Sequence, residues 1–173
     1  VLEQSDATAW MAFYCLNMLE IAREIAQRTP ALDDLVIKFM EHFALISNAM
    51  HTKDLWDEQD GFFYDMLRGP DGRHVPLRVR SMVGIIPLFS TKIIGEEDLA
   101  GAQALRKGFA AMAQRRGIGE EDVRKAGILV DIGGERRMIV GVAARGRVRR
   151  ILAHLFDEDS FLSRYGLRAV SRW

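Results

Sequence analysis

Residues 55–65 have the sequence LWDEQDGFFYD and decide how the helices on either side of them are joined. Aromatic and acidic side chains surround one glycine, so the stretch can hold a metal, contact a sugar or simply form a turn. An EF-hand calcium loop needs oxygen ligands at positions one and twelve and glycine at position six. With Gly61 at position six, Trp56 and Leu67 occupy those two ligand positions, so the EF-hand interpretation fails.

A β-hairpin explains the same stretch better, because Asp60-Gly61 is a strong signal for a two-residue turn. Pro70-Asp71-Gly72 supplies a second turn signal. We therefore expect a small three-stranded meander over about residues 54–80, inserted between helices. Its acids are still available to a cation brought by another segment. In a hairpin with its turn at Asp60-Gly61, alternate residues share a face. One face then carries Trp56, Glu58, Phe63 and Asp65, and the other carries Asp57, Gln59, Phe62 and Tyr64.

Helical periodicity dominates the N-terminal side of this insert. Residues 8–28 repeat apolar side chains at spacings of three and four, and Thr29-Pro30 ends the pattern. Asp33 and Asp34 open a second helix with the same periodicity, which extends to Met50. A short loop between two helices predicts an antiparallel helical hairpin.

The remaining chain is less regular. Residues 81–94 predict an apolar helix that bends or restarts near Pro87, and residues 95–116 predict an amphipathic helix. Residues 126–142 contain β-branched runs around Gly133-Gly134 and favour either a hairpin or an irregular excursion. Residues 145–156 return to a helical pattern, and residues 157–173 predict a loop of mixed polarity.

Composition limits the class of protein. A chain of 173 residues with 49% hydrophobic and 28% charged content can bury one core, so we expect a single domain over residues 1–173. The formal net charge is zero and no apolar run is long enough for a membrane span, so we expect neither nucleic acid nor a membrane as partner, and a cytoplasmic location. The chain starts without methionine almost directly on a helix, which indicates a section of a longer protein.

Sequence motifs for metals, nucleotides and nucleophilic catalysis are absent. The four histidines have no metal-ligand spacing, and no Walker loop, dinucleotide fingerprint, HExxH or CxxC occurs, so we expect no cofactor and no metal. Cys15 lies in an apolar helical run and predicts a buried thiol. A basic cluster predicts either a solvated helix face or a phosphate site; its members are Arg145, Arg147, Arg149 and Arg150. Aromatic rings beside carboxylates and arginines are typical both of sugar sites and of helix-end packing.

Three blocks of the sequence resemble consecutive blocks of bacterial proteins in glycoside hydrolase family 63. They are LEQSDATAWMAFYCLNMLEIA, LWDEQDGFFYDMLRGPDGRHVPLRVRSMVGIIPL and ILAHLFDEDSFLSRYGLRAVSRW. The resemblance implies a mainly α fold, part of an (α/α)6 barrel built from helical hairpins with the small β-meander inserted. It also implies an inverting hydrolase acting on α-glucosides or related sugars, in which one carboxyl group protonates the leaving oxygen and a second activates water.

The catalytic pair implied by the family lies outside residues 1–173, so the resemblance predicts a section that is inactive alone and contributes substrate-binding wall and scaffold. The expected partner is an oligosaccharide or small glycoside. Apolar faces left open would meet the remainder of the barrel or a second copy, so we expect self-association, association with a complementary fragment, or marginal folding. A non-catalytic carbohydrate-binding remnant and a helical interaction scaffold are the alternative functions.

The candidate binding residues follow from the resemblance. Asp6 in the Gln-x-Asp-x-x-Ala-Trp motif either binds sugar hydroxyls or caps its helix, and Trp10 is either a sugar platform or a core residue. Trp56 is either a loop scaffold or a sugar contact. The closing Tyr-Gly-x-Arg-x-x-Ser-Arg motif corresponds to a loop near the active site of the family, and its candidates are Tyr165, Arg168, Ser171 and Arg172.

Overall fold

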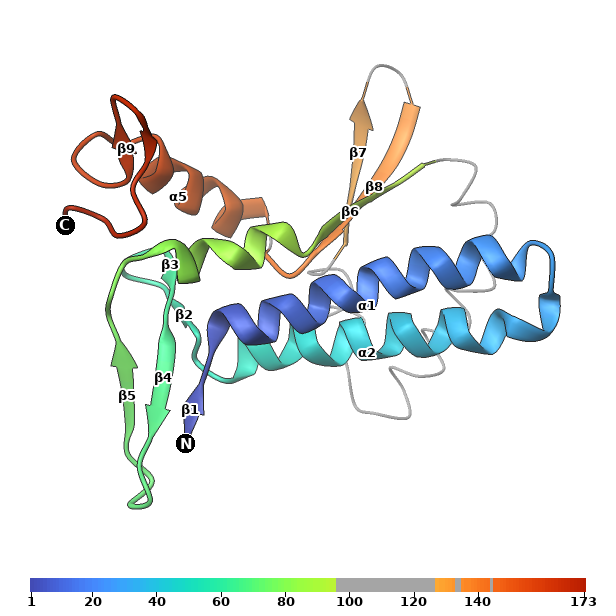
Figure 1. The fold of residues 1–173 in the computed structure, drawn as a ribbon, viewed down its shortest axis with the longest axis horizontal. Helices are drawn as coiled ribbons and strands as arrows, with labels where there is room; N and C mark the ends of the chain where they lie inside the picture. The colour runs from blue at the N-terminus through green and yellow to red at the C-terminus, as the bar shows by residue number, and fades with distance from the viewer. Residues whose placement is uncertain (96–126, 133–134, 144) are drawn as a thin grey trace.

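The computed structural model describes residues 1–95, 127–132, 135–143 and 145–173. Two long helices lie side by side and antiparallel in it, α1 (Ser5–Ala26) and α2 (Asp33–Thr52) (Figure 1). A short 3₁₀ turn, η1 (Pro30–Leu32), joins them. The helical hairpin predicted from the 3.6-residue period is therefore confirmed.

The buried face of α1 consists mostly of small residues. Ala9, Ala12, Leu16, Leu19 and Ala22 recur at spacings of three and four and are almost fully buried. Alanine lets two helix backbones approach closely, so α2 packs tightly against this face. Cys15 is only half-buried beside it, and that partial burial raises the pKa of its thiol.

The start of α1 is capped by a residue sixty positions away. Gln4 occupies the N-cap position but makes no side-chain capping bond. Asp65 Oδ1 instead accepts the backbone N–H of Ser5 at 2.7 Å and the Ser5 hydroxyl at 3.0 Å. A carboxylate at a helix N-terminus satisfies free N–H groups and opposes the helix dipole. This contact fastens α1 to the β region.

The opening stretch forms a hairpin with a longer loop than predicted. Strand β2 (Trp56–Asp57) pairs with β3 (Phe62–Phe63) in the register Trp56↔Phe63, which leaves the four residues 58–61 in the loop. The predicted two-residue turn at Asp60-Gly61 was therefore wrong. Asp57 Oδ1 accepts the N–H groups of Gln59 and Asp60 and so stabilises the wider loop, while Gly61 adopts a φ of 66°.

The predicted three-stranded meander is divided into two sheets. Strands β4 (Asp65–Arg68) and β5 (His74–Leu77) form the predicted hairpin around Pro70-Asp71-Gly72, and Gly72 has a φ of 78°. Strand β1 (Leu2–Glu3) pairs with the other edge of β4. The β2–β3 ladder is a separate two-stranded sheet, and Tyr64 is the one residue between β3 and β4.

The region after the insert contains a short helix and a second three-stranded sheet. The helix predicted over residues 81–94 is a 3₁₀ helix, η2 (Met82–Phe89), followed by strand β6 (Thr91–Ile94). Strands β7 (Gly127–Ile132) and β8 (Glu135–Gly141) form an antiparallel hairpin, the first of the two predicted alternatives. Strand β6 completes the sheet in the order β6-β8-β7. Of the helix predicted over residues 95–116, only Gly95 lies among the described residues.

The C-terminal part of the chain, residues 145–173, packs against the β2–β3 hairpin. Helix α5 (Arg145–Leu155) follows the predicted pattern, and the last segment carries two short strands, β9 (Leu162–Ser163) and β10 (Gly166–Leu167) (Figure 1). Phe62 stacks on Phe161 with ring centroids 5.8 Å apart, and both rings are fully buried. The core therefore joins the hairpin to the C-terminal segment.

The expected mainly α fold, a partial (α/α)6 barrel, was wrong. The described residues combine two long α-helices, one shorter α-helix and two 3₁₀ helices with four small antiparallel sheets. The physical reason is that β-branched and aromatic runs paired with one another instead of continuing as helices, and their rings fill the core beside α1 and α2. Among the described residues, no helix has the length and apolar character needed to cross a bilayer.

Candidate functional site

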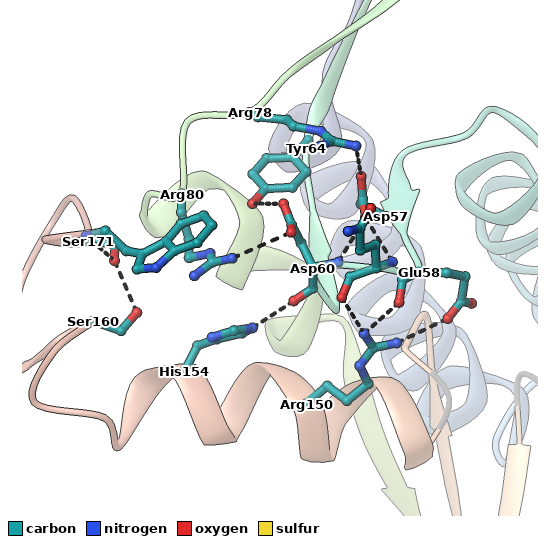
Figure 2. A network of polar contacts seen from close by, with 12 residues as sticks. Asp57, Glu58, Asp60, Tyr64, Arg78, Arg80, Arg150, His154, Ser160 and Ser171 are labelled. Atoms are coloured by element: carbon teal, nitrogen blue, oxygen red, sulfur yellow. Dashed lines mark hydrogen bonds and ion pairs between the residues drawn. The ribbon is translucent and has the colours of Figure 1, made fainter.

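A polar network around Asp60 joins four segments that are distant in the sequence (Figure 2). The Tyr64 hydroxyl donates to Asp60 Oδ2 at 3.0 Å, and Arg80 Nη2 lies 3.9 Å from Asp60 Oδ1. The Asp60 carbonyl accepts from His154 Nε2 at 2.8 Å. Because a carbonyl can only accept, His154 Nε2 is the donor in this hydrogen bond. Asp60 thus links the hairpin loop to the segment before η2 and to α5.

Asp57, the residue just before the loop of residues 58–61, stabilises the backbone of that loop. Its Oδ1 accepts two backbone N–H groups and its Oδ2 accepts from Arg78 Nη2 at 2.8 Å. The pKa of Asp57 lies below its ordinary value, first because the N–H of Asp60 hydrogen-bonds the ionised carboxylate and further because of the Arg78 charge. Partial burial acts in the opposite direction. Asp57 is therefore a permanently ionised structural acceptor at neutral pH.

Trp56 lies beneath two arginines of α5. The guanidinium carbons of Arg147 and Arg150 lie 4.9 and 5.6 Å from the Trp56 ring centroid. Both arginines also pair with Glu58, and Arg150 donates to the carbonyls of Glu58 and Gln59. Desolvation by burial lowers the pKa of Arg147, and the Glu58 charge partly offsets that change.

These contacts change the interpretation of the basic cluster. Arg147 and Arg150 hold the aromatic-acidic loop against α5, so they do not form a wholly solvated face. Arg149 points to solvent, in keeping with the solvated-face alternative.

The last fourteen residues, 160–173, form the C-terminal loop, whose backbone is held by hydrogen bonds from its own side chains. Arg168 Nη1 donates to the carbonyls of Glu158, Ser160 and Leu162. The buried hydroxyls of Ser160 and Ser171 lie 3.0 Å apart. Three guanidinium contacts and a buried hydroxyl pair give the loop a defined backbone conformation, although its only strands have two residues each.

This loop is also joined to the segment before η2. Ser81 forms an antiparallel bridge with Val170. The Arg80 guanidinium stacks on the Trp173 ring at 4.3 Å. Arg80 therefore contacts both the C-terminal loop and Asp60.

The predicted site residues of α1 lie at its beginning. Asp6 is in the first turn and accepts the N–H of Ala7 at 2.7 Å, while Asp65 provides the longer-range cap. Trp10 is 38% exposed, with its ring edge-on to Phe13 and tilted against Phe89. Trp10 is thus shared between packing and the surface.

The other predicted residues divide into buried and exposed sets. Trp56 is only 8% exposed and lies under α5, so its ring faces are covered. Arg168 and Ser171 stabilise the C-terminal loop. Tyr165, 92% exposed, and the side chain of Arg172 point to solvent from that loop. The structure therefore gathers the C-terminal candidates in one loop and places Trp56 elsewhere, beneath α5.

The sequence analysis singled out neither Arg80 nor His154, and it named Arg147 and Arg150 only as members of a basic cluster. Arg147, Arg150 and His154 are three and four residues apart on α5, so their shared face was detectable from helical spacing. Arg80 carried no such local signal, because its partners Asp60 and Trp173 lie far away in the chain. Within the described part of the chain, no group of three or more histidine, cysteine or acidic side chains is placed to hold a metal ion.

Comparison with known proteins identifies one relative of similar sequence. The chain is 34% identical over 188 aligned residues to the uncharacterized protein YMR196W of Saccharomyces cerevisiae. The alignment covers 99% of this chain and 17% of the yeast protein, so the chain spans about a sixth of the length of that relative. No protein-family model matches the chain, and no solved structure matches it.

Proposed function

We propose that this chain is a section of a larger inverting glycoside hydrolase, of the family 63 type, that acts on α-glucosides or related sugars. In this proposal the section supplies scaffold and part of the substrate-binding surface, and the acid and base that act on the glycosidic bond come from elsewhere in the enzyme. The three sequence blocks that resemble this family support the proposal. The length of the yeast relative is compatible with a much larger protein.

The proposal rests on the C-terminal loop. Hydrogen bonds hold the backbone of this loop, and two of its aromatic rings are exposed to solvent. Arg168 and the Ser160–Ser171 pair hold the loop from inside. Tyr165 and Trp173 are nevertheless 92% and 77% exposed. Burying such rings is favourable, so a preformed loop that exposes them is suited to a ligand.

The chemistry of these side chains fits a sugar. A pyranose presents C–H groups on its faces, against which an aromatic ring packs, and hydroxyl groups at its edge, which a guanidinium can hydrogen-bond. Tyr165 and Trp173 supply rings, and Arg172 supplies an exposed guanidinium within the same loop. The loop would orient the sugar, and it would exclude water from the face on which the ring packs.

The acids of the hairpin have a supporting role in this proposal. A general acid of a glycosidase needs a raised pKa so that it holds a proton at neutral pH. The pKa of Asp57 is lowered, and Asp60 and Asp65 accept hydrogen bonds that hold the loop and α1 in place. In this proposal the three carboxylates hold backbone and side chains in place, and the acid and base come from elsewhere in the enzyme.

Titration of the chain with a panel of α-glucosidic disaccharides and trisaccharides tests the proposal. We expect saturable binding, seen as quenching of tryptophan fluorescence and as shifts of the Tyr165 and Trp173 resonances in NMR spectra. Replacing Tyr165 by Ala should weaken the binding about five- to tenfold, as expected for the loss of one aromatic contact of ~1 kcal/mol.

The matched control is Phe156→Ala, which removes another exposed ring, 69% exposed, just beyond the end of α5. It should leave the sugar affinity unchanged. Absence of binding by the unmodified chain, or equal losses in the two variants, would overturn the sugar-binding role of the loop.

A further inference from the structure

The backbone around Trp173 is fixed by hydrogen bonds to its own loop and to the segment before η2. The Met82 N–H donates to the Ala169 carbonyl at 2.9 Å, and the Ser171 N–H donates to the Arg80 carbonyl at 2.8 Å. The Trp173 N–H donates to the Ser171 hydroxyl at 3.1 Å. These bonds place Trp173 beside Arg80, and only the side-chain torsions of Trp173 remain to be set.

Arg80 is a buried cation held between an acid and two aromatic rings. Its Nη2 lies 3.9 Å from Asp60 Oδ1, and its Nε meets no hydrogen-bond acceptor among the described residues. Burying a charge is costly unless its surroundings compensate for the lost water. The guanidinium carbon lies 5.9 Å from the Phe62 ring centroid and 4.3 Å from that of Trp173. A guanidinium is planar and weakly hydrated, so it stacks on rings in a way that a lysine ammonium does not.

The two faces of the Trp173 ring are therefore not equivalent. At 4.3 Å the guanidinium and the ring are in van der Waals contact, so no ligand fits between them. Trp173 is nevertheless largely exposed. A ligand reaches this ring only from the side that faces away from Arg80.

We propose that Arg80 is the positioning residue for Trp173 and holds the ring with one face presented to the sugar. Asp60 pairs with the same guanidinium, so the hairpin loop of residues 58–61 contributes to the orientation of a ring in the C-terminal loop (Figure 2). A ring that is already ordered does not have to be immobilised when the sugar binds. The identity of the ligand rests on the proposed function, whereas the orientation of the ring exists without any ligand.

Tyr165 provides the contrast within the same loop. The guanidinium carbon of Arg164 lies 5.7 Å from the Tyr165 ring centroid, but Arg164 is itself exposed. No buried group among the described residues holds that arginine, so its contact does not fix the Tyr165 ring. The loop thus combines one oriented ring, Trp173, with one adaptable ring, Tyr165.

Fluorine NMR of the chain labelled with 5-fluorotryptophan tests the orientation without a sugar. The sequence has three tryptophans, and replacing each by Phe in turn assigns the three resonances. In the unmodified chain the Trp173 resonance should be displaced from that of free 5-fluorotryptophan. Arg80→Lys keeps a positive charge near Asp60 but removes the planar group, so it should move the Trp173 resonance to the free position. The Trp10 and Trp56 resonances should stay in place, which shows in the same spectrum that the fold is retained.

Two further variants make the measurement specific. Arg164→Met removes the arginine beside Tyr165 and should leave the Trp173 resonance unchanged. Asp60→Asn keeps the size of the side chain but removes the charge that pairs with Arg80. It should move the Trp173 resonance in the same direction as Arg80→Lys, by a smaller amount. A Trp173 resonance that is unchanged in both Arg80→Lys and Asp60→Asn would overturn the positioning role.

Sugar titration of the same proteins tests what the orientation contributes to binding. Arg80→Lys should weaken the affinity about two- to tenfold, the range expected when one side chain must be ordered on binding. Equal affinities of the unmodified chain and Arg80→Lys, with the Trp173 resonance displaced, would show that the orientation does not serve the sugar and would refute the proposal. If the resonances move as expected but the unmodified chain binds no sugar, the proposed function fails and the positioning of Trp173 by Arg80 stands.

Discussion

Asp57 and Asp60 lie three positions apart in one loop and have different structural roles. Asp57 accepts N–H groups of its own loop and pairs with Arg78, so it determines the local backbone. Asp60 contacts Tyr64, Arg80 and His154, so it joins distant segments. Both are mostly buried, and a carboxylate in such a position is retained only when its oxygens are satisfied.

The lowered pKa of Asp57 predicts a change of stability with pH. Its folded-state pKa lies below the value in the unfolded chain, so its contribution is fully present above the unfolded pKa of about 4 and is lost as the pH falls through the folded pKa. The unfolding free energies of the unmodified chain and Asp57→Asn, measured by urea titration, should differ by a constant amount from pH 7 to 5. The difference should shrink below pH 4. A difference that grows on acidification would contradict the assigned direction.

Gly61 and Gly72 form a matched pair for testing the hairpin loop. Both have positive φ, 66° and 78°, so alanine strains the backbone at each by about 1 kcal/mol. A Cβ at Gly61 would in addition overlap the Arg150 guanidinium, whereas a Cβ at Gly72 meets nothing within 4 Å. Gly61→Ala should therefore lower the free energy of unfolding more than Gly72→Ala does, and only Gly61→Ala should disturb α5. Equal losses in chemical denaturation would show that the Arg150 clamp contributes nothing.

At the scale of elements, the contact between η2 and β3 depends on Gly84. A Cβ on Gly84 would overlap the Phe62 ring and the Phe63 carbonyl oxygen, and backbone cannot move aside as a flexible side chain can. Gly84→Ala should cost about 2–4 kcal/mol of stability, as for other overpacked or strained core positions. Thermal unfolding measures the loss. Gly146→Ala, where a Cβ meets nothing within 4 Å, is the control and should change the melting temperature little.

Elements that rest on local periodicity were predicted well. The helices α1, α2 and α5 follow apolar spacings of three and four, and turn chemistry at Pro70-Asp71-Gly72 identified the β4–β5 hairpin. The helix expected at residues 81–94 became η2 and β6. Pro87 removes an N–H donor there, and the β-branched residues after it pair with β8. The outcome depended on a partner strand more than forty residues away.

At the scale of the whole molecule, segments that are far apart in the sequence meet around the β2–β3 hairpin. The polar network joins the hairpin, Arg80, α5 and the C-terminal loop into one unit that exposes Tyr165 and Trp173. The sugar titration tests whether these exposed rings bind a ligand.

The sequence by itself determined α1, α2, α5, the turn at Pro70-Asp71-Gly72 and the presence of a hairpin in residues 55–65, because these depend on residues within a few positions of one another. It also identified the C-terminal motif that becomes the exposed loop. Only the tertiary structure decided that Trp56 lies beneath Arg147 and Arg150, that Asp65 caps α1, and that the expected barrel is replaced by small sheets. The physical reason is that strand pairing, long-range caps and ion pairs depend on partners whose distance along the chain leaves no periodic trace.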